Sequence, residues 1–171
     1  MEINEFINNV LPMKDKMLRL ARNILRHRED SEDLVQEAMI KLWKKKDDLK
    51  SCESLTALVM ITTKNLCIDK LRAQKRKFVN IDEIEIAEQS NDRLTIEEQN
   101  DTFNKVKLII ESLPINQKII VHMKDVEGMS NEEIAKIMNI EIVSVRVNLS
   151  RARKTIREQF VKHYNYIPYE N

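Results

Sequence analysis

The sequence contains very little glycine and proline. Gly128 is the single glycine among 171 residues, where average usage predicts roughly twelve, and there are only three prolines. The hairpin turns of β-sandwiches and barrels depend on these residues, and so does a glycine-rich phosphate loop. Both kinds of structure are therefore excluded, and the sequence predicts an all-α fold.

Cysteine pairs, long apolar runs and catalytic motifs are also missing. Cys52 and Cys67 are the only cysteines, which excludes a disulfide framework and a paired-cysteine metal site. No run approaches the roughly 18 apolar residues that span a membrane, and the N-terminus lacks the pattern of a secretion signal. The three histidines, His27, His122 and His163, are scattered. We expect an intracellular protein without membrane insertion, catalytic residues, metal site or cofactor.

Charged residues are abundant but unevenly distributed. The 29 basic and 28 acidic side chains nearly cancel, yet residues 76–100 carry seven acidic side chains against three basic ones. This segment also lacks a sustained helical period of apolar residues, which favours an acidic linker. We therefore predict a helical domain over 1–77, a linker over 78–100, a second helical domain over 101–166 and a tail over 167–171. The alternative is a loop with one short helix inside a single domain.

Two short segments, 64–77 and 144–162, are strongly basic. Each contains six basic side chains and one acidic side chain, inside a chain whose net charge is +1. A solvated helix face is the usual meaning of such a run. Two of them, one in each predicted domain, favour a polyanion that is bound at two places.

The C-terminal half follows the pattern of a helix-turn-helix. A helix is predicted to begin at Pro114, because proline suits the first helical position, and to end near Gly128. Ser130 and Glu133 have the spacing of a capping box, which predicts the start of a second, short helix. Asn139 tolerates the left-handed conformation that a tight turn requires.

A longer helix is predicted to begin near Ile142. Four apolar residues recur at helical spacing and should form its buried stripe: Val145, Leu149, Ala152 and Ile156. The basic residues of the segment fall outside this stripe. A short capped helix, a tight turn and a helix with a basic outer face suit insertion into a DNA major groove. The alternative is a helical hairpin whose basic face is merely solvated.

At this point the sequence resembles a known family. The segment EGMSNEEIAKIMNIEIVSVRVNLSRARKTIREQF is similar to the C-terminal promoter-binding domain of bacterial RNA polymerase sigma factors of the extracytoplasmic-function (ECF) group. The matching features are the EG-x-S turn, the EEIA helix start and the V-x-x-x-L-S-RAR second helix. The resemblance implies that the following residues face the −35 promoter element: Ser144, Arg146, Val147, Ser150, Arg151 and Lys154. Arg153 is expected to contact a phosphate or to form an intradomain salt bridge.

The segment DSEDLVQEAMIKLWKK resembles the sigma-factor motif that docks on core RNA polymerase. Asp30 is predicted to cap this helix, and Leu34, Ala38 and Leu42 share one face and should be buried. The resemblance implies polymerase contacts from these residues: Asp33, Gln36, Glu37, Met39, Ile40 and Trp43. For Trp43 a place in the hydrophobic core is an equal alternative.

An uninterrupted helix is predicted over 54–78. It resembles the family's N-x-x-x-D-x-x-R pattern in the helix that meets the −10 element as the strands part. The resemblance implies that the −10 strand is bound by these residues: Lys64, Asn65, Arg72, Lys75 and Arg76. Asp69 is expected to pair with a neighbouring arginine, and the preceding loop, about 49–53, is expected to receive a flipped base.

The resemblance as a whole implies a cytoplasmic sigma factor. Its expected partners are core RNA polymerase, promoter DNA and, as a hypothesis, an anti-sigma factor, and no obligate homo-oligomer is expected. The competing interpretation is a dimeric helix-turn-helix repressor that binds a palindromic duplex unaided. Such a repressor accounts for residues 113–158 but not for the docking motif or the second basic segment.

Overall fold

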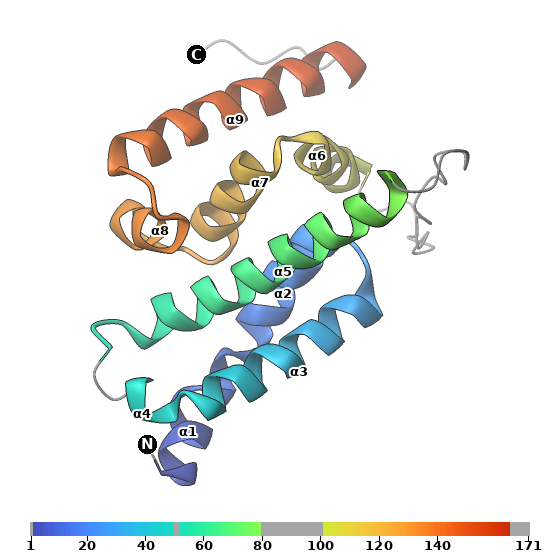
Figure 1. Cartoon of the computed structure of the whole chain (residues 1–171). Helices are drawn as coiled ribbons and strands as arrows, with labels where there is room; N and C mark the ends of the chain where they lie inside the picture. The colour runs from blue at the N-terminus through green and yellow to red at the C-terminus, as the bar shows by residue number, and fades with distance from the viewer. Residues whose placement is uncertain (1, 50–51, 80–100, 165–171) are drawn as a thin grey trace.

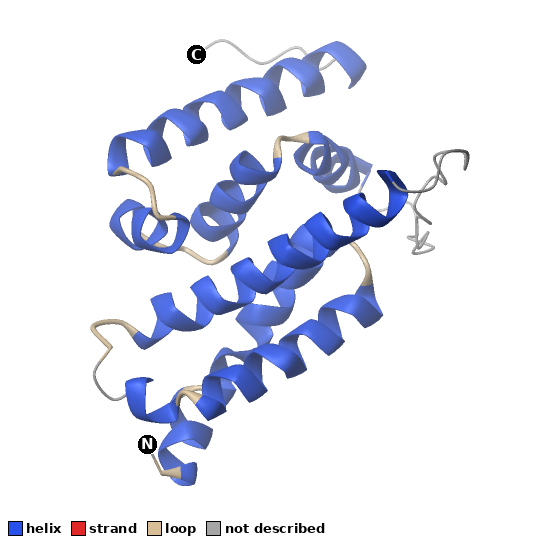
Figure 2. Ribbon diagram, in the orientation of Figure 1, coloured by secondary structure: helices blue, strands red, loops and turns tan. Residues whose placement is uncertain are grey.

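A computed structural model describes residues 2–49, 52–79 and 101–164, and these residues are helical apart from short connections, without a strand (Figure 2). The N-terminal half contains α1 (Ile3–Asn9), η1 (Leu11–Met13), α2 (Lys14–Leu25), α3 (Arg28–Lys44), α4 (Lys46–Leu49) and α5 (Leu55–Val79). The C-terminal half contains α6 (Asp101–Ser112), α7 (Ile115–Val121), η2 (His122–Val126), α8 (Asn131–Met138) and α9 (Ile142–Tyr164). The all-α prediction is confirmed.

Helices α2, α3 and α5 pack against one another and form the centre of the N-terminal half. Each supplies an apolar face, because apolar residues recur at three- and four-residue spacing along it. Met17 and Leu20 of α2, Val35 of α3, and Val59 and Met60 of α5 are all at most 1% exposed. The predicted core positions Leu34, Ala38 and Leu42 are buried as expected.

In the C-terminal half, α9 packs on α6, α7 and α8. Its buried residues Val145, Leu149 and Ala152 belong to the predicted stripe, and Ile156 of the same stripe is half-buried against the core. The helix predicted to begin at Pro114 was expected to run to near Gly128. Instead α7 ends at Val121 and continues as a π-helical turn, in which the Glu127 N–H donates to the His122 carbonyl at 3.1 Å.

The two halves pack directly against each other. Helix α5 contacts α8, and α2 contacts α7 and η2, so that α5 runs between the N-terminal and C-terminal helices (Figure 1). The buried apolar side chains of both halves form one continuous cluster. Among the described helices, none combines the length and the apolar character required to cross a bilayer.

Candidate functional site

The start of α8 is fixed by the predicted capping box. The Ser130 hydroxyl accepts from the Glu133 N–H at 3.1 Å, and the Glu133 carboxylate accepts from the Ser130 N–H at 2.7 Å. This backbone hydrogen bond lowers the pKa of Glu133 below its ordinary value. Asn139 ends the helix with φ of 54°, in the left-handed region. The capping box and the turn are therefore confirmed: the first begins α8, and the second ends it before α9.

The predicted DNA-reading side chains lie on the outer face of α9. Arg146, Val147, Ser150, Arg151 and Lys154 are exposed, whereas Ser144 is half-buried. Val147 is 40% exposed although it is apolar, so it is available to contact a thymine methyl group. The face combines hydrogen-bond donors, positive charge and one small apolar side chain.

Arg153 forms an intradomain salt bridge, which was one of its two expected roles. Its Nη2 lies 2.8 Å from Oδ1 of Asp125, so it forms a salt bridge between α9 and η2. Lys154 is paired only loosely with Glu158, at 3.7 Å and with both side chains largely exposed. Lys154 is thus able to exchange this partner for a phosphate.

A shallow groove of about 700 Å³ follows this face of α9. Most of its lining side chains are basic or polar: Lys124, Asn131, Arg146, Ser150, Arg153, Lys154 and Arg157, together with Leu149 and Glu158. Lys124 and Asn131 come from η2 and the first turn of α8, and the sequence analysis did not predict them. A signal existed for Asn131, because it directly follows the N-cap and a helix N-terminus favours anions.

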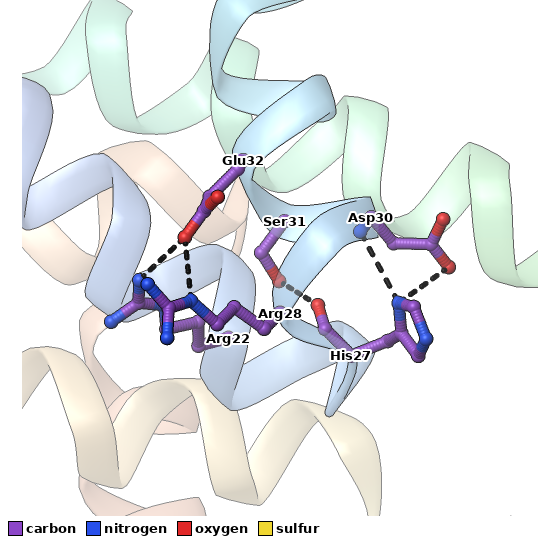
Figure 3. Close-up of polar contacts among 6 residues, drawn as sticks. All are labelled: Arg22, His27, Arg28, Asp30, Ser31 and Glu32. Atoms are coloured by element: carbon purple, nitrogen blue, oxygen red, sulfur yellow. Dashed lines mark hydrogen bonds and ion pairs between the residues drawn. The ribbon is translucent and has the colours of Figure 1, made fainter.

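The start of α3 is held by a local network of side chains (Figure 3). The prediction that Asp30 caps this helix is wrong: α3 begins at Arg28, and the His27 ring accepts from the Asp30 N–H at 3.3 Å. The Ser31 hydroxyl donates to the His27 carbonyl at 2.6 Å. Asp30 lies in the first turn, and its carboxylate binds Lys70 of α5 at 2.6 Å. The Asp30 side chain thus ties α3 to α5 instead of closing the helix end.

The predicted docking face of α3 is exposed over most of its length. Asp33, Gln36 and Glu37 are exposed, Ile40 is 55% exposed, and Met39 is half-buried. Glu37 pairs with Lys41 at 2.9 Å along the same helix. An isoleucine this exposed among polar residues is a natural centre for a helix-on-helix contact.

Trp43 is half-buried because α1 covers part of it. The Phe6 ring meets it edge-on at a centroid distance of 5.2 Å, and Lys46 Nζ lies 4.6 Å from the centre of the ring. Trp43 therefore joins α1 to α3 and keeps part of its surface exposed. The two alternatives for this residue were a place in the hydrophobic core and a contact with the polymerase, and its half-buried position agrees with neither alone.

Four of the five predicted −10 residues are exposed along α5: Asn65, Arg72, Lys75 and Arg76. Asp69 lies 3.8 Å from Arg72, so it has the structural pairing that was expected.

The fifth residue, Lys64, is engaged by the other half of the molecule. It is half-buried, and its ammonium donates to the Ile137 carbonyl of α8 at 2.8 Å. Burial lowers the pKa of Lys64. At the start of α5, Glu53 pairs with Lys136 of α8 at 2.8 Å. Of the predicted base-binding loop, residues 50–51 lie outside the described residues and Leu49 is buried.

The described residues bring together no group of His, Cys, Asp and Glu side chains suited to a metal ion. Cys67 is fully buried, and burial raises the pKa of its thiol to about 12. This thiol is protonated at neutral pH and cannot act as a nucleophile.

Two family models match the chain. "Sigma-70 region 2" matches residues 11–77, and "Sigma-70, region 4" matches residues 103–156. The first covers helices α2 to α5 with the exposed face of α3, and the second covers the helix-turn-helix. Together they span the basic segment 64–77 and most of the basic segment 144–162.

Known proteins of similar sequence and fold agree with these models. The ECF RNA polymerase sigma factor SigE of Mycolicibacterium smegmatis is 28% identical over 157 residues, covering 87% of this chain and 59% of that protein. The RNA polymerase sigma-E factor of Streptomyces coelicolor is 26% identical over 169 residues, covering 94% of this chain and 88% of that protein. The chain thus spans less than two thirds of the first relative and most of the second.

A solved structure has a similar fold. It is the sigma factor RpoE from Bartonella quintana in complex with the anti-sigma factor NepR, with a TM-score of 0.73 and 21% identity. The match covers 95% of this chain and 99% of that chain.

Proposed function

The chain belongs to the sigma-70 family of RNA polymerase sigma factors, in its ECF group, and from this premise we propose that it binds core RNA polymerase and directs initiation at specific promoters. The observation that supports this function most is the pairing of two surfaces in one chain. One is the exposed, partly apolar face of α3, and the other is the basic outer face of α9.

We assign the polymerase and promoter contacts to two parts of the chain. Residues 1–77 would dock on the polymerase and contact the −10 element, and residues 101–166 would bind the −35 element. Residues 78–100 would be an acidic linker, of which 78–79 form the end of α5 and 80–100 lie outside the described residues. Residues 167–171 would be a tail that also lies outside them.

The face of α9 suits a major groove. Arg146 and Arg151 can each donate two hydrogen bonds to a guanine, and Val147 can pack on a thymine methyl group. Ser144 and Ser150 supply short hydrogen-bonding side chains next to them. Lys154 lies where a phosphate contact would fix the register of the helix without reading sequence.

The N-terminal half suits the contacts with core polymerase and with the −10 element. Gln36, Glu37 and Ile40 would meet a helical surface of core polymerase, with Asp33, Met39 and the exposed part of Trp43 at its margin. The exposed cations of α5 would follow the backbone of the non-template strand, because positive charge beside a single strand supplies affinity that depends little on sequence.

In this role the chain is not an enzyme and needs no cofactor of its own, because the polymerase carries out the chemistry. It would act in the cytoplasm, where polymerase and promoters are located, and without an obligate homo-oligomer. The solved relative from Bartonella was in complex with an anti-sigma factor, which supports a restraining partner of that kind for this chain as well.

In vitro transcription tests the proposal directly. Genomic DNA of the host, sheared to a few kilobases, is transcribed by core polymerase with and without the full chain, and the transcript starts are sequenced. New starts that share upstream elements support the function. If the chain adds no starts but shifts palindromic duplex DNA by itself, the dimeric repressor is the better account.

A further inference from the structure

The N-terminal end of α9 exposes two apolar side chains on a face that is otherwise polar. Val143 is 66% exposed, the most exposed large apolar side chain in the part of the chain that the structure describes, and Val147 is 40% exposed. Sequence patterns predicted a DNA contact for Val147 but not for Val143. The two residues are four positions apart, so they lie on the same side of the helix, one turn from each other.

Val143 and Val147 occupy the centre of the outer face of α9. At 3.6 residues per turn, both lie roughly 150–170° around the helix from the centre of its buried stripe. Arg146 lies on one side of this apolar pair and Arg151 on the other, and both arginines are exposed. The first two turns of α9 therefore present an apolar ridge between two arginines. In a helix-turn-helix, the N-terminal residues of the second helix are those that contact base edges.

The surroundings of the two valines favour DNA as their partner. The groove along this face of α9 is lined by five basic side chains and one acidic side chain, which suits a polyanion. In the major groove of DNA, thymine presents a methyl group, whereas the other base edges present hydrogen-bond donors and acceptors. A helix that carries an apolar ridge between two arginines therefore matches thymines that lie beside guanines.

The asparagine near this ridge is engaged within the helix. Asn148 is half-buried, and its side-chain amide donates to the Ser144 carbonyl at 2.8 Å. Asparagine and glutamine are the side chains that bind an adenine edge with two hydrogen bonds. Because Asn148 is held in this way, the side chains that the ridge offers to an A·T base pair are the two valines, and these fit its thymine methyl group.

We propose that Val143 is a specificity-determining residue of this chain. Val143 and Val147 each pack on a thymine methyl group, so the −35 element contains two thymines beside the guanines bound by Arg146 and Arg151. The valines are about 6 Å apart along the helix, which is comparable with about two base-pair steps of 3.4 Å, so the thymines lie within two steps of each other. This inference rests on the proposed function and adds to it the bases that the upstream element contains.

Replacement of thymidine by deoxyuridine removes only the methyl group from the base and tests the contact directly. The duplex is a promoter fragment found by the transcription experiment above, and deoxyuridine replaces each thymidine of its −35 element in turn. Holoenzyme formed from core polymerase and the full chain should bind two of these duplexes about two- to fivefold more weakly, as expected for the loss of one buried methyl group.

The variant Val143→Ala assigns one of the two sensitive thymines to its side chain. At that position the variant should bind the thymidine and deoxyuridine duplexes equally, while the other position stays sensitive, because a double-mutant cycle isolates the pair in contact. Val143→Ile should keep both sensitivities. Val161→Ala is the matched control, since it makes the same change at an exposed position farther along α9, and it should behave as the wild type.

The outcomes separate this inference from the proposed function. Equal effects of deoxyuridine on the wild type and on Val143→Ala at every thymine would overturn the role of Val143, and so would −35 elements without thymine. In both cases a holoenzyme that still initiates at its promoters leaves the proposed function intact. If the full chain forms no holoenzyme with core polymerase, the proposed function fails, and the contact between Val143 and promoter DNA fails with it.

Discussion

At the scale of single residues, Lys118 is the least expected feature. It is 2% exposed on α7, beside Arg26 and Glu111, and burial lowers the pKa of its ammonium to about 8. Below pH 8 the folded chain must keep a buried cation, whereas the unfolded chain keeps a solvated one. Lys118 therefore costs stability at neutral pH, and this cost disappears as the pH rises toward the ordinary lysine pKa.

Replacement of this lysine gives a prediction with a defined sign. Lys118→Met should raise the free energy of unfolding at pH 7 by about 2 to 3 kcal/mol, since each unit of pKa shift corresponds to about 1.4 kcal/mol. The advantage over the wild type should shrink between pH 8 and pH 10.5, because the wild-type lysine is then neutral when folded. Urea unfolding at pH 7 and pH 9.5 measures both values. Exposed Lys107→Met is the control, and a pH-independent advantage would contradict the explanation.

The reading face of α9 gives a second prediction at this scale. Arg146→Ala and Arg151→Ala should each reduce transcription from a target promoter by about tenfold or more, because a bidentate arginine–guanine pair is worth about 1–3 kcal/mol. Lys154→Ala should instead weaken binding to all DNA sequences alike. It should also reduce the slope of log K against log salt concentration by about one. All three variants should bind core polymerase as the wild type does. Loss of core binding would remove the assignment of this face to DNA.

At the scale of helices, the capping box sets where the helix-turn-helix begins. Ser130→Ala removes the acceptor for the Glu133 N–H and should cost about 1 kcal/mol, which lowers the melting temperature by about 2–4 °C. Ser150→Ala, at an exposed position in the middle of α9, should change stability by less than about 0.5 kcal/mol. Equal melting temperatures for the two variants would show that the cap does not hold α8.

The docking face of α3 gives the complementary prediction. Gln36→Ala combined with Ile40→Ala should reduce the affinity for core polymerase by at least about tenfold, because exposed apolar residues at the centre of an interface carry much of its energy. The melting temperature should not change, since neither side chain is buried. Val126→Ala, an equally exposed apolar position of the C-terminal half, is the matched control. Unchanged affinity would place the docking surface elsewhere.

Helices with strong local signals were predictable, and those shaped by tertiary contacts were not. The start of α8, the left-handed Asn139 and the buried stripe of α9 all follow from local capping and periodicity. The start of α3 did not, because His27 caps it while Asp30 binds Lys70 on another helix. The π-helical turn after Val121 has no local signal either, and it leads to Glu127, which binds Arg19.

At the scale of the whole molecule, sequence patterns indicated two helical units but not their packing. The contacts between the halves join residues 73, 83 and 108 positions apart, and helical periodicity contains no information about such pairs. The same separation explains why Lys64 was predicted as a DNA contact and is found against α8. The basic segment around Lys64 could be recognised in the sequence, whereas its contact with α8 could not be predicted from it.

Co-elution with core RNA polymerase tests the central claim most directly. The full chain is mixed with core enzyme of its own host, without DNA, and the mixture is separated on a sizing column. A one-to-one complex that is lost in the Gln36→Ala and Ile40→Ala variant and retained in Arg146→Ala is the predicted result. Elution of the chain apart from core, as a dimer that binds duplex DNA unaided, would contradict it.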